Sequence, residues 1–177
     1  MGLKAHVTAG DVLLLTPRNF VGRLIAKITF GKVNHAAIVF DANSVFETDG
    51  DQLKADFAPI EKYEGRSMYI IRAGYIRDNL SKVQRLCKFY SGSPYSYWDI
   101  VTNATFFFLT RQIRSKVVGL FGSKKYMVCS ELISRILYEA TGNKVWKDFE
   151  GTTPEDMRDI ALKNPLEHTI KSYEGQQ

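Results

Sequence analysis

The most informative stretch of this sequence is NHAAIVFDANSVFET, residues 34–48. Its two halves, 36–40 and 44–48, are rich in β-branched and aromatic residues, which favour strands. The Asp-Ala-Asn between them, at 41–43, is typical of a turn. The stretch therefore predicts a β-hairpin that begins with a histidine and carries a glutamate in its second strand.

The register of this hairpin brings ionisable side chains near one another. If residue 40 pairs with residue 44, Ala37 lies opposite Glu47 and His35 lies opposite Asp49. Glu47 is then the diagonal neighbour of His35 on the same face, within reach of its imidazole. A slip of one residue would move Glu47 to the other face. A carboxylate within so apolar a run also needs a polar partner.

Cys129 lies where a nucleophile would be placed. It comes directly before apolar residues at helical spacing, and we therefore place it at the start of a helix. Unpaired N–H groups and the helix dipole there favour a thiolate, and the same N–H groups can stabilise an oxyanion. The alternative is a small buried hydrophobe, which is what we expect of Cys87 in the middle of another helix.

A nucleophilic thiol needs a base, and His35 is the best candidate among the three histidines. Its strand continues with small residues that leave room for another element, whereas His6 is near a terminus and His168 is in a polar tail. The alternative for His35 is a surface histidine or a satisfied core histidine. Together, Cys129, His35 and Glu47 form a more specific signal than any one of them alone.

The rest of the chain predicts a single α+β domain over residues 1–177, with a helical insertion or lid at 98–125. Further strands are expected at 12–15 and 68–72, and helices at 20–30, 79–90, 98–121, 129–141 and after an N-cap at Thr153.

Composition limits the function classes. The 177 residues, 45% hydrophobic and 24% charged, suit one globular domain and exclude wholesale disorder. A net charge of +5 suits an anionic surface but is too small to argue for nucleic acid. The cysteines and histidines lack zinc-ligand spacing, so we expect no metal and no cofactor. With no leader peptide or membrane-spanning run, we expect a cytoplasmic protein with reduced thiols, or one peripheral at a membrane.

Six short motifs follow one another along the chain. They are Gly10-Asp11, Asn34-His35-Ala36-Ala37-Ile38-Val39, Val45-Phe46-Glu47, Gly92-Ser93-Pro94-Tyr95, Cys129-Ser130-Glu131-Leu132 and Thr153-Pro154-Glu155-Asp156. In this order, with His before Cys, the chain resembles permuted papain-fold proteins of the NlpC superfamily. The most similar branch is the YiiX/YaeF-like one, with more distant kin among lecithin:retinol acyltransferases. The resemblance implies a papain-like (circularly permuted NlpC-type) fold, a small antiparallel sheet or barrel packed on helices.

The resemblance also implies roles. Cys129 would be the nucleophile, His35 the base and Glu47 the group that orients the base. Tyr95 matches a family tyrosine beside the nucleophile, whose hydroxyl would help to hold the oxyanion; the alternative is a packed aromatic in a turn. The family usually has Asp at the next position, where this chain has serine. We group Ser130 with Tyr95 as oxyanion or substrate-binding residues.

The insertion carries three consecutive aromatic residues, Phe106, Phe107 and Phe108, followed by basic residues with no acid between Asp99 and Lys125. Three consecutive helical residues span about 200° of the helix, so at least one ring should point away from the core. The combination predicts an interfacial helix or an acyl-chain lid. The alternative is a core helix whose outer face is basic and solvated.

These features support two function hypotheses. The first is a cysteine-dependent hydrolase or acyltransferase that acts through an acyl-enzyme. The family resemblance implies amide or ester bonds of peptide-like cell-wall substrates or of lipid-like N-acyl substrates. The second is a non-enzymatic lipid- or membrane-binding module on the same fold. Nucleic-acid binding is a distant third, because basic and aromatic residues do not interleave along an exposed sheet.

Overall fold

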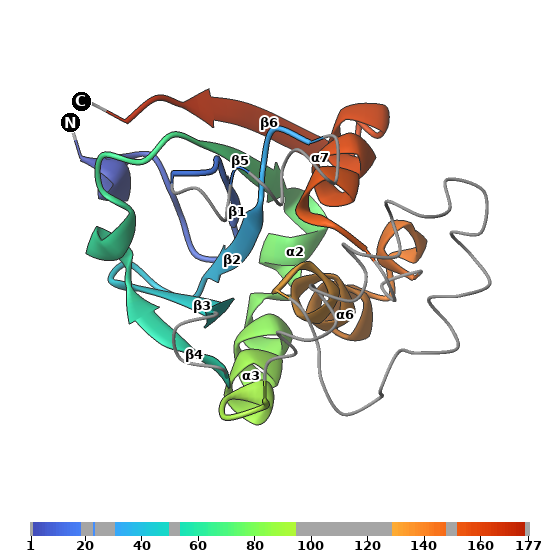
Figure 1. Ribbon diagram of the computed structural model, residues 1–177. Helices are drawn as coiled ribbons and strands as arrows, with labels where there is room; N and C mark the ends of the chain where they lie inside the picture. The colour runs from blue at the N-terminus through green and yellow to red at the C-terminus, as the bar shows by residue number, and fades with distance from the viewer. Residues whose placement is uncertain are drawn as a thin grey trace, which may run out of the picture.

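The computed structural model describes residues 2–18, 23, 31–49, 54–94, 129–147 and 152–175. In these ranges six strands form one antiparallel sheet in the order β4-β3-β2-β1-β5-β6 (Figure 1). The strands are β1 (Val12–Leu15), β2 (His35–Val39), β3 (Ser44–Asp49), β4 (Lys54–Pro59), β5 (Met68–Ala73) and β6 (His168–Tyr173). The helices are α2 (Gly74–Asp78), α3 (Leu80–Tyr90), α6 (Cys129–Thr141) and α7 (Pro154–Lys163), with 3-10 turns η1 (Leu3–Ala5), η2 (Ile60–Tyr63) and η3 (Lys144–Trp146). The expected α+β class is confirmed.

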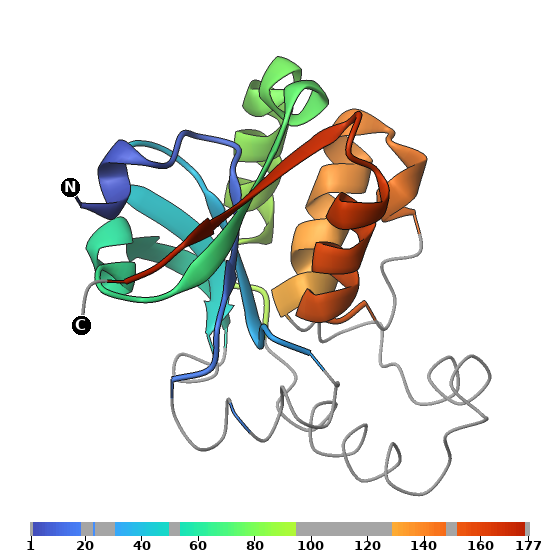
Figure 2. The ribbon, with the colours of Figure 1, turned by 90° about the horizontal axis from the view of Figure 1, so that it is seen from above.

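The sheet has a core on each face. Helices α3, α6 and α7 lie on one side of it and the turns η1 and η2 on the other (Figure 2). The central strand β1 is apolar throughout because both of its faces are buried. Val12 and Leu14 pack toward the helices, and Leu13 and Leu15 pack toward the other core. Alternate residues of β2 and β3 divide in the same way.

The hairpin of β2 and β3 has the predicted register. Ala37 pairs with Glu47, and the turn closes with Phe40 donating its N–H to the carbonyl of Ser44. The Asp41 carboxylate accepts the N–H groups of Asn43 and Ser44, each at 2.8 Å, as an Asx turn does. Glu47 therefore lies on the face that His35 occupies.

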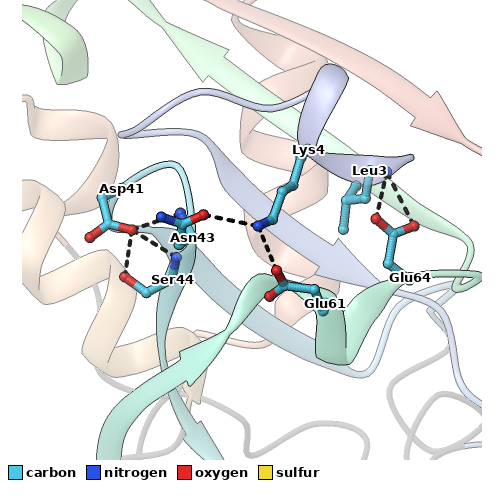
Figure 3. A network of polar contacts seen from close by, with 7 residues as sticks. All are labelled: Leu3, Lys4, Asp41, Asn43, Ser44, Glu61 and Glu64. Atoms are coloured by element: carbon cyan, nitrogen blue, oxygen red, sulfur yellow. Dashed lines mark hydrogen bonds and ion pairs between the residues drawn. The ribbon is translucent and has the colours of Figure 1, made fainter. Parts of the chain in front are cut away.

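A polar network ties the N-terminal turn to η2 and to the hairpin (Figure 3). Lys4 Nζ lies 2.9 Å from Asn43 Oδ1 and 2.5 Å from the Glu61 carboxylate. The Leu3 N–H donates to the Glu64 carboxylate, 3.0 Å from Oε1. Because Leu3 itself is fully buried, η1 is held by both a packed side chain and these polar contacts. The short turn η2 is thus fixed from its outer side.

Most of the expected elements are present, and two strands were missed. The strand expected at 68–72, the helices expected at 79–90 and 129–141, and the Thr153 cap, which forms a full capping box, are confirmed. β4 and β6 were not predicted, and the interpretation of His168 as part of a polar tail is wrong, since it lies buried in β6. Apart from residue 23, the helix expected at 20–30 lies outside the described residues, as does the insertion at 98–125. Of the helices that are described, none has the length and apolarity needed to cross a membrane.

Candidate active site

Cys129 is the first residue of α6, a helix that packs against β2 and β3. The helix buries an apolar face that includes Leu132, Ile133 and Ile136, and this packing fixes its position over the sheet. Cys129 is a free cysteine, largely buried. Its location at the beginning of α6 places the thiol beside the N–H groups of the first helical turn.

His35 lies at the start of β2, and its ring is shared between two partners. His35 Nε2 is 2.6 Å from Glu47 Oε2, and the Cys129 side chain lies close enough to the ring to raise its pKa. The His35 side chain is 18% exposed and that of Glu47 only 3% exposed. Nε2 faces Glu47, so Nδ1 is the other ring nitrogen, the one that the carboxylate leaves unoccupied. The structure thus brings Cys129, His35 and Glu47 together.

The charges of this group reinforce one another. Burial lowers the pKa of His35, but hydrogen bonding and attraction from Cys129 and Glu47 outweigh it and raise the pKa to about 10. Burial likewise opposes ionisation of Glu47, yet His35, Lys62 and Tyr63 lower its pKa to about 2. At neutral pH the ring is therefore an imidazolium held by a carboxylate.

Sequence reasoning missed two partners of Glu47. Lys62 Nζ donates to Glu47 Oε1 at 2.7 Å, and the Tyr63 hydroxyl donates to Oε2. Tyr63 Oη also lies 3.3 Å from His35 Nε2. Both residues belong to η2, some fifteen positions beyond Glu47 in the chain. The apolar run around residue 47 predicted that its carboxylate needs partners, but nothing local indicated which ones.

The first turn of α7 and the residues just before it contact both halves of the site. The Ser130 hydroxyl donates to the carbonyl of Thr152 at 2.5 Å, and Ser130 is fully buried. Glu155 Oε2 accepts the N–H of Lys32 at 2.7 Å and that of Val33 at 3.3 Å, directly before His35. The Ser130 hydroxyl is therefore engaged in holding α6 to the residues that precede α7.

Other sequence-predicted site residues lie elsewhere. Tyr95 and Phe106, Phe107 and Phe108 are outside the described residues. Cys87 is buried in α3, where burial raises the pKa of its thiol to about 12, so it is the inert core cysteine that the sequence predicted. Asp11, from the first of the six motifs, is fully buried and accepts both Arg72 Nε at 2.8 Å and Nη2 at 2.6 Å.

Among the residues that the structure describes, no three His, Cys, Asp or Glu side chains gather closely enough to hold a metal ion. Two cationic side chains meet at Glu47, the Lys62 ammonium and the His35 imidazolium.

Comparison with known proteins identifies the fold. No protein-family model matches the sequence, and no curated protein matches it. Among solved structures, the chain is similar to the crystal structure of metalloprotein YiiX from Escherichia coli O157:H7 (DUF1105), with a TM-score of 0.56 and 17% identity. The match covers 96% of this chain and 97% of that one. At this identity the likeness shows a shared fold, and it confirms the resemblance to the YiiX/YaeF-like branch at that level.

Proposed function

From the YiiX-like fold and the arrangement of its three side chains, we propose that this chain is a cysteine-dependent hydrolase or acyltransferase. The observation that carries the proposal is the position of His35, which contacts Cys129 and lies 2.6 Å from Glu47. Nucleophile, base and orienting carboxylate in contact are the arrangement that acyl transfer requires. Three separate segments supply them, so the contact is a product of the fold.

The chemistry follows from the charges. The Cys129 thiolate attacks the carbonyl carbon of an amide or ester and forms a C–S bond. The tetrahedral oxyanion accepts hydrogen bonds from N–H groups at the start of α6. As the C–N or C–O bond breaks, the His35 imidazolium gives its proton to the departing amine or alcohol. Water or an amine then loses a proton to His35, attacks the thioester and releases the thiolate.

The proposal includes a circularly permuted papain-like topology and a class of substrate. The base on β2 precedes the nucleophile on α6 in the chain, the order of a circularly permuted papain-like protein. The helix that bears the thiol packs on the strands that bear the base and the carboxylate, as papain-like chemistry needs. The family resemblance directs the substrate toward peptide-like cell-wall amides or lipid-like N-acyl groups.

Thiol labelling tests the proposal with an internal control. Iodoacetamide at neutral pH should alkylate Cys129 at least about 100-fold faster than buried Cys87, because the anion is the reactive form. His35→Ala should lower the Cys129 rate by about tenfold or more, whereas His6→Ala, at an exposed histidine, should not. An activated acetyl ester should leave an acetyl group on Cys129. Equal labelling of both thiols in the folded protein would refute the proposal.

A second candidate, binding to an anionic membrane, is favoured by the outer face of α3. Phe89 is 75% exposed there, and Lys82, Arg85 and Lys88 are exposed on a helix that contains no acid. An exposed aromatic flanked by cations suits a lipid interface. Cosedimentation with phosphatidylserine vesicles that Phe89→Ser weakens, with Cys129 labelling unchanged, would support this candidate. Equal binding to neutral vesicles, or none, would exclude it.

A further inference from the structure

Glu47 makes more contacts than orientation of His35 requires. His35 and Tyr63 share its Oε2, and Lys62 occupies Oε1 at 2.7 Å. Tyr63 is fully buried, and Glu47 nearly so. Each oxygen of the carboxylate therefore has a donor from η2, and its plane cannot turn without losing one of them.

The donors are presented by a turn that is itself fixed. Ile60 is buried in the second core and donates its N–H to the Asn43 carbonyl at 2.9 Å. On the outside, Glu61 pairs with Lys4 and Glu64 accepts the N–H of Leu3 (Figure 3). The turn η2 thus joins the hairpin to the N-terminus, with Glu61 facing Lys4 and with Lys62 and Tyr63 facing Glu47.

The electrostatic effect of Lys62 on the ring has a definite sign. An ammonium on Glu47 Oε1 neutralises part of the charge that stabilises the His35 imidazolium, and it also repels the imidazolium. Among the described residues, the other ionisable groups around the ring are Cys129 of α6 and Tyr63 of η2. The Arg66 guanidinium lies 5.5 Å from the centre of the Tyr63 ring and adds a further cation.

We propose that Lys62 and Tyr63 are positioning residues of the active site, Lys62 limiting how tightly Glu47 holds the His35 proton and Tyr63 fixing the rotamer of the Glu47 carboxylate. This inference rests on the proposed function for its catalytic meaning. Its physical content is a difference in the protonation of one ring, which can be measured without a substrate.

The test for Lys62 is the pH titration of the His35 ring by NMR, with the signal assigned by its loss in His35→Ala. Lys62→Met should move the His35 midpoint upward by about one pH unit, since a cation a few ångströms away is removed. Lys62→Arg, which keeps the charge, should leave it within about 0.2 units. Lys171→Met removes the same charge at the opposite sheet edge and should also leave it unchanged. An unchanged or lowered midpoint in Lys62→Met overturns the proposal.

The test for Tyr63 is the pH profile of Cys129 alkylation. Tyr63→Phe should reduce the rate about five- to tenfold at every pH, because an unfixed carboxylate holds the ring in the reactive orientation for less of the time. Tyr69→Phe, on β5, is the matched control and should have the wild-type rate. Urea unfolding of each variant identifies any loss that is only a loss of folding. An unchanged rate in folded Tyr63→Phe overturns its assigned role.

The two proposals fail separately. If the His35 midpoint rises in Lys62→Met but Cys129 reacts no faster than Cys87, the effect of Lys62 on the His35 pKa is confirmed and the proposed enzymatic function is wrong. If Cys129 is selectively reactive but the midpoint ignores Lys62, the enzymatic proposal stands and the assignment of Lys62 is wrong.

Discussion

His35 and His168 are both largely buried, and each ring has a partner 2.6 Å from Nε2. Their pKa values are nevertheless shifted in opposite directions, upward in His35 and downward in His168. The partner of His35 is the Glu47 carboxylate, and the partner of His168 is the Tyr75 hydroxyl. Burial lowers the pKa of both rings. In His35, Cys129 and Glu47 reverse that effect, whereas in His168 the Asn164 carbonyl opposes burial too weakly and the pKa stays lowered.

The hydrogen bonds around His168 explain its neutral state. Trp146 Nε1 can only donate, and it donates to Tyr75 Oη at 2.7 Å. The Tyr75 hydroxyl then donates to His168 Nε2, and His168 Nδ1 donates to the Asn164 carbonyl at 3.2 Å. This chain of bonds links η3, α2, β6 and the end of α7. The charge of the partner, more than burial, decides whether a buried histidine is an acid or a structural link.

The largest expected effect comes from removing the carboxylate that distinguishes the two regions. Glu47→Ala should reduce the free energy of unfolding by about 3 kcal/mol or more, because Lys62 and His35 lose the buried anion that compensates them. Asp56→Ala removes a more exposed carboxylate, on β4 directly opposite Glu47, and should reduce the free energy of unfolding by less than about 1 kcal/mol. Urea unfolding at neutral pH measures both. Similar losses in the two variants would show that the Glu47 pairing is no stronger than a surface one.

The corresponding test of the second region is Tyr75→Phe. It leaves Trp146 Nε1 and His168 Nε2 without their common partner, so we expect a loss of about 1–3 kcal/mol. Tyr69→Phe, on β5, should change the free energy of unfolding by less than about 0.5 kcal/mol. The loss in Tyr75→Phe should leave Cys129 alkylation unchanged in the folded protein. A lower alkylation rate would show that the two histidine regions are coupled.

The sequence predicted the hairpin and its register because strand alternation and turn chemistry are local. Those two features were enough to place Glu47 beside His35, and helical periodicity placed Cys129 at the start of α6. The contact between Cys129 and His35 was anticipated by the order of the family motifs, since no local pattern joins residues so far apart.

The rest of the site depends on tertiary packing that periodicity does not encode. Lys62 and Tyr63 reach Glu47 from a 3-10 turn, which has no amphipathic signature. β6 was missed because its burial pattern is mostly open to solvent, as befits an edge strand. His168 was therefore assigned to a tail, although its own side chain is the buried one.

The pH dependence of the free energy of unfolding should distinguish the two histidines, because their pKa values are shifted in opposite directions. The pKa of His35 is raised in the folded state, so its stabilisation is complete below about pH 6.5 and is lost as pH rises toward 10. The pKa of His168 is lowered, so its stabilisation is complete above about pH 6.5 and is lost as pH falls through the folded value.

Urea unfolding at a series of pH values should show the free energy of unfolding falling on an acidic limb and on an alkaline limb. Each histidine should contribute a slope no steeper than about 1.4 kcal/mol per pH unit. His35→Gln should flatten the alkaline limb, and His168→Gln should flatten the acidic one. If either variant flattened the other's limb, the assignment of opposite protonation states would be wrong.

The smallest expected effect concerns the outer contacts of η2, which support the His35 region. Lys4→Ala removes the pair with Glu61 and the bond to Asn43, both at exposed positions (Figure 3). Exposed pairs contribute little, so the loss in unfolding free energy should be about 0.2–1 kcal/mol. A double-mutant cycle with Glu61→Ala should give a coupling energy in the same range. The buried Ile60 and Tyr63 should keep η2 in place, so the His35 midpoint should not move. A shift of more than about 0.3 pH units in Lys4→Ala would mean that the N-terminal turn, through η2, tunes the charge of the ring.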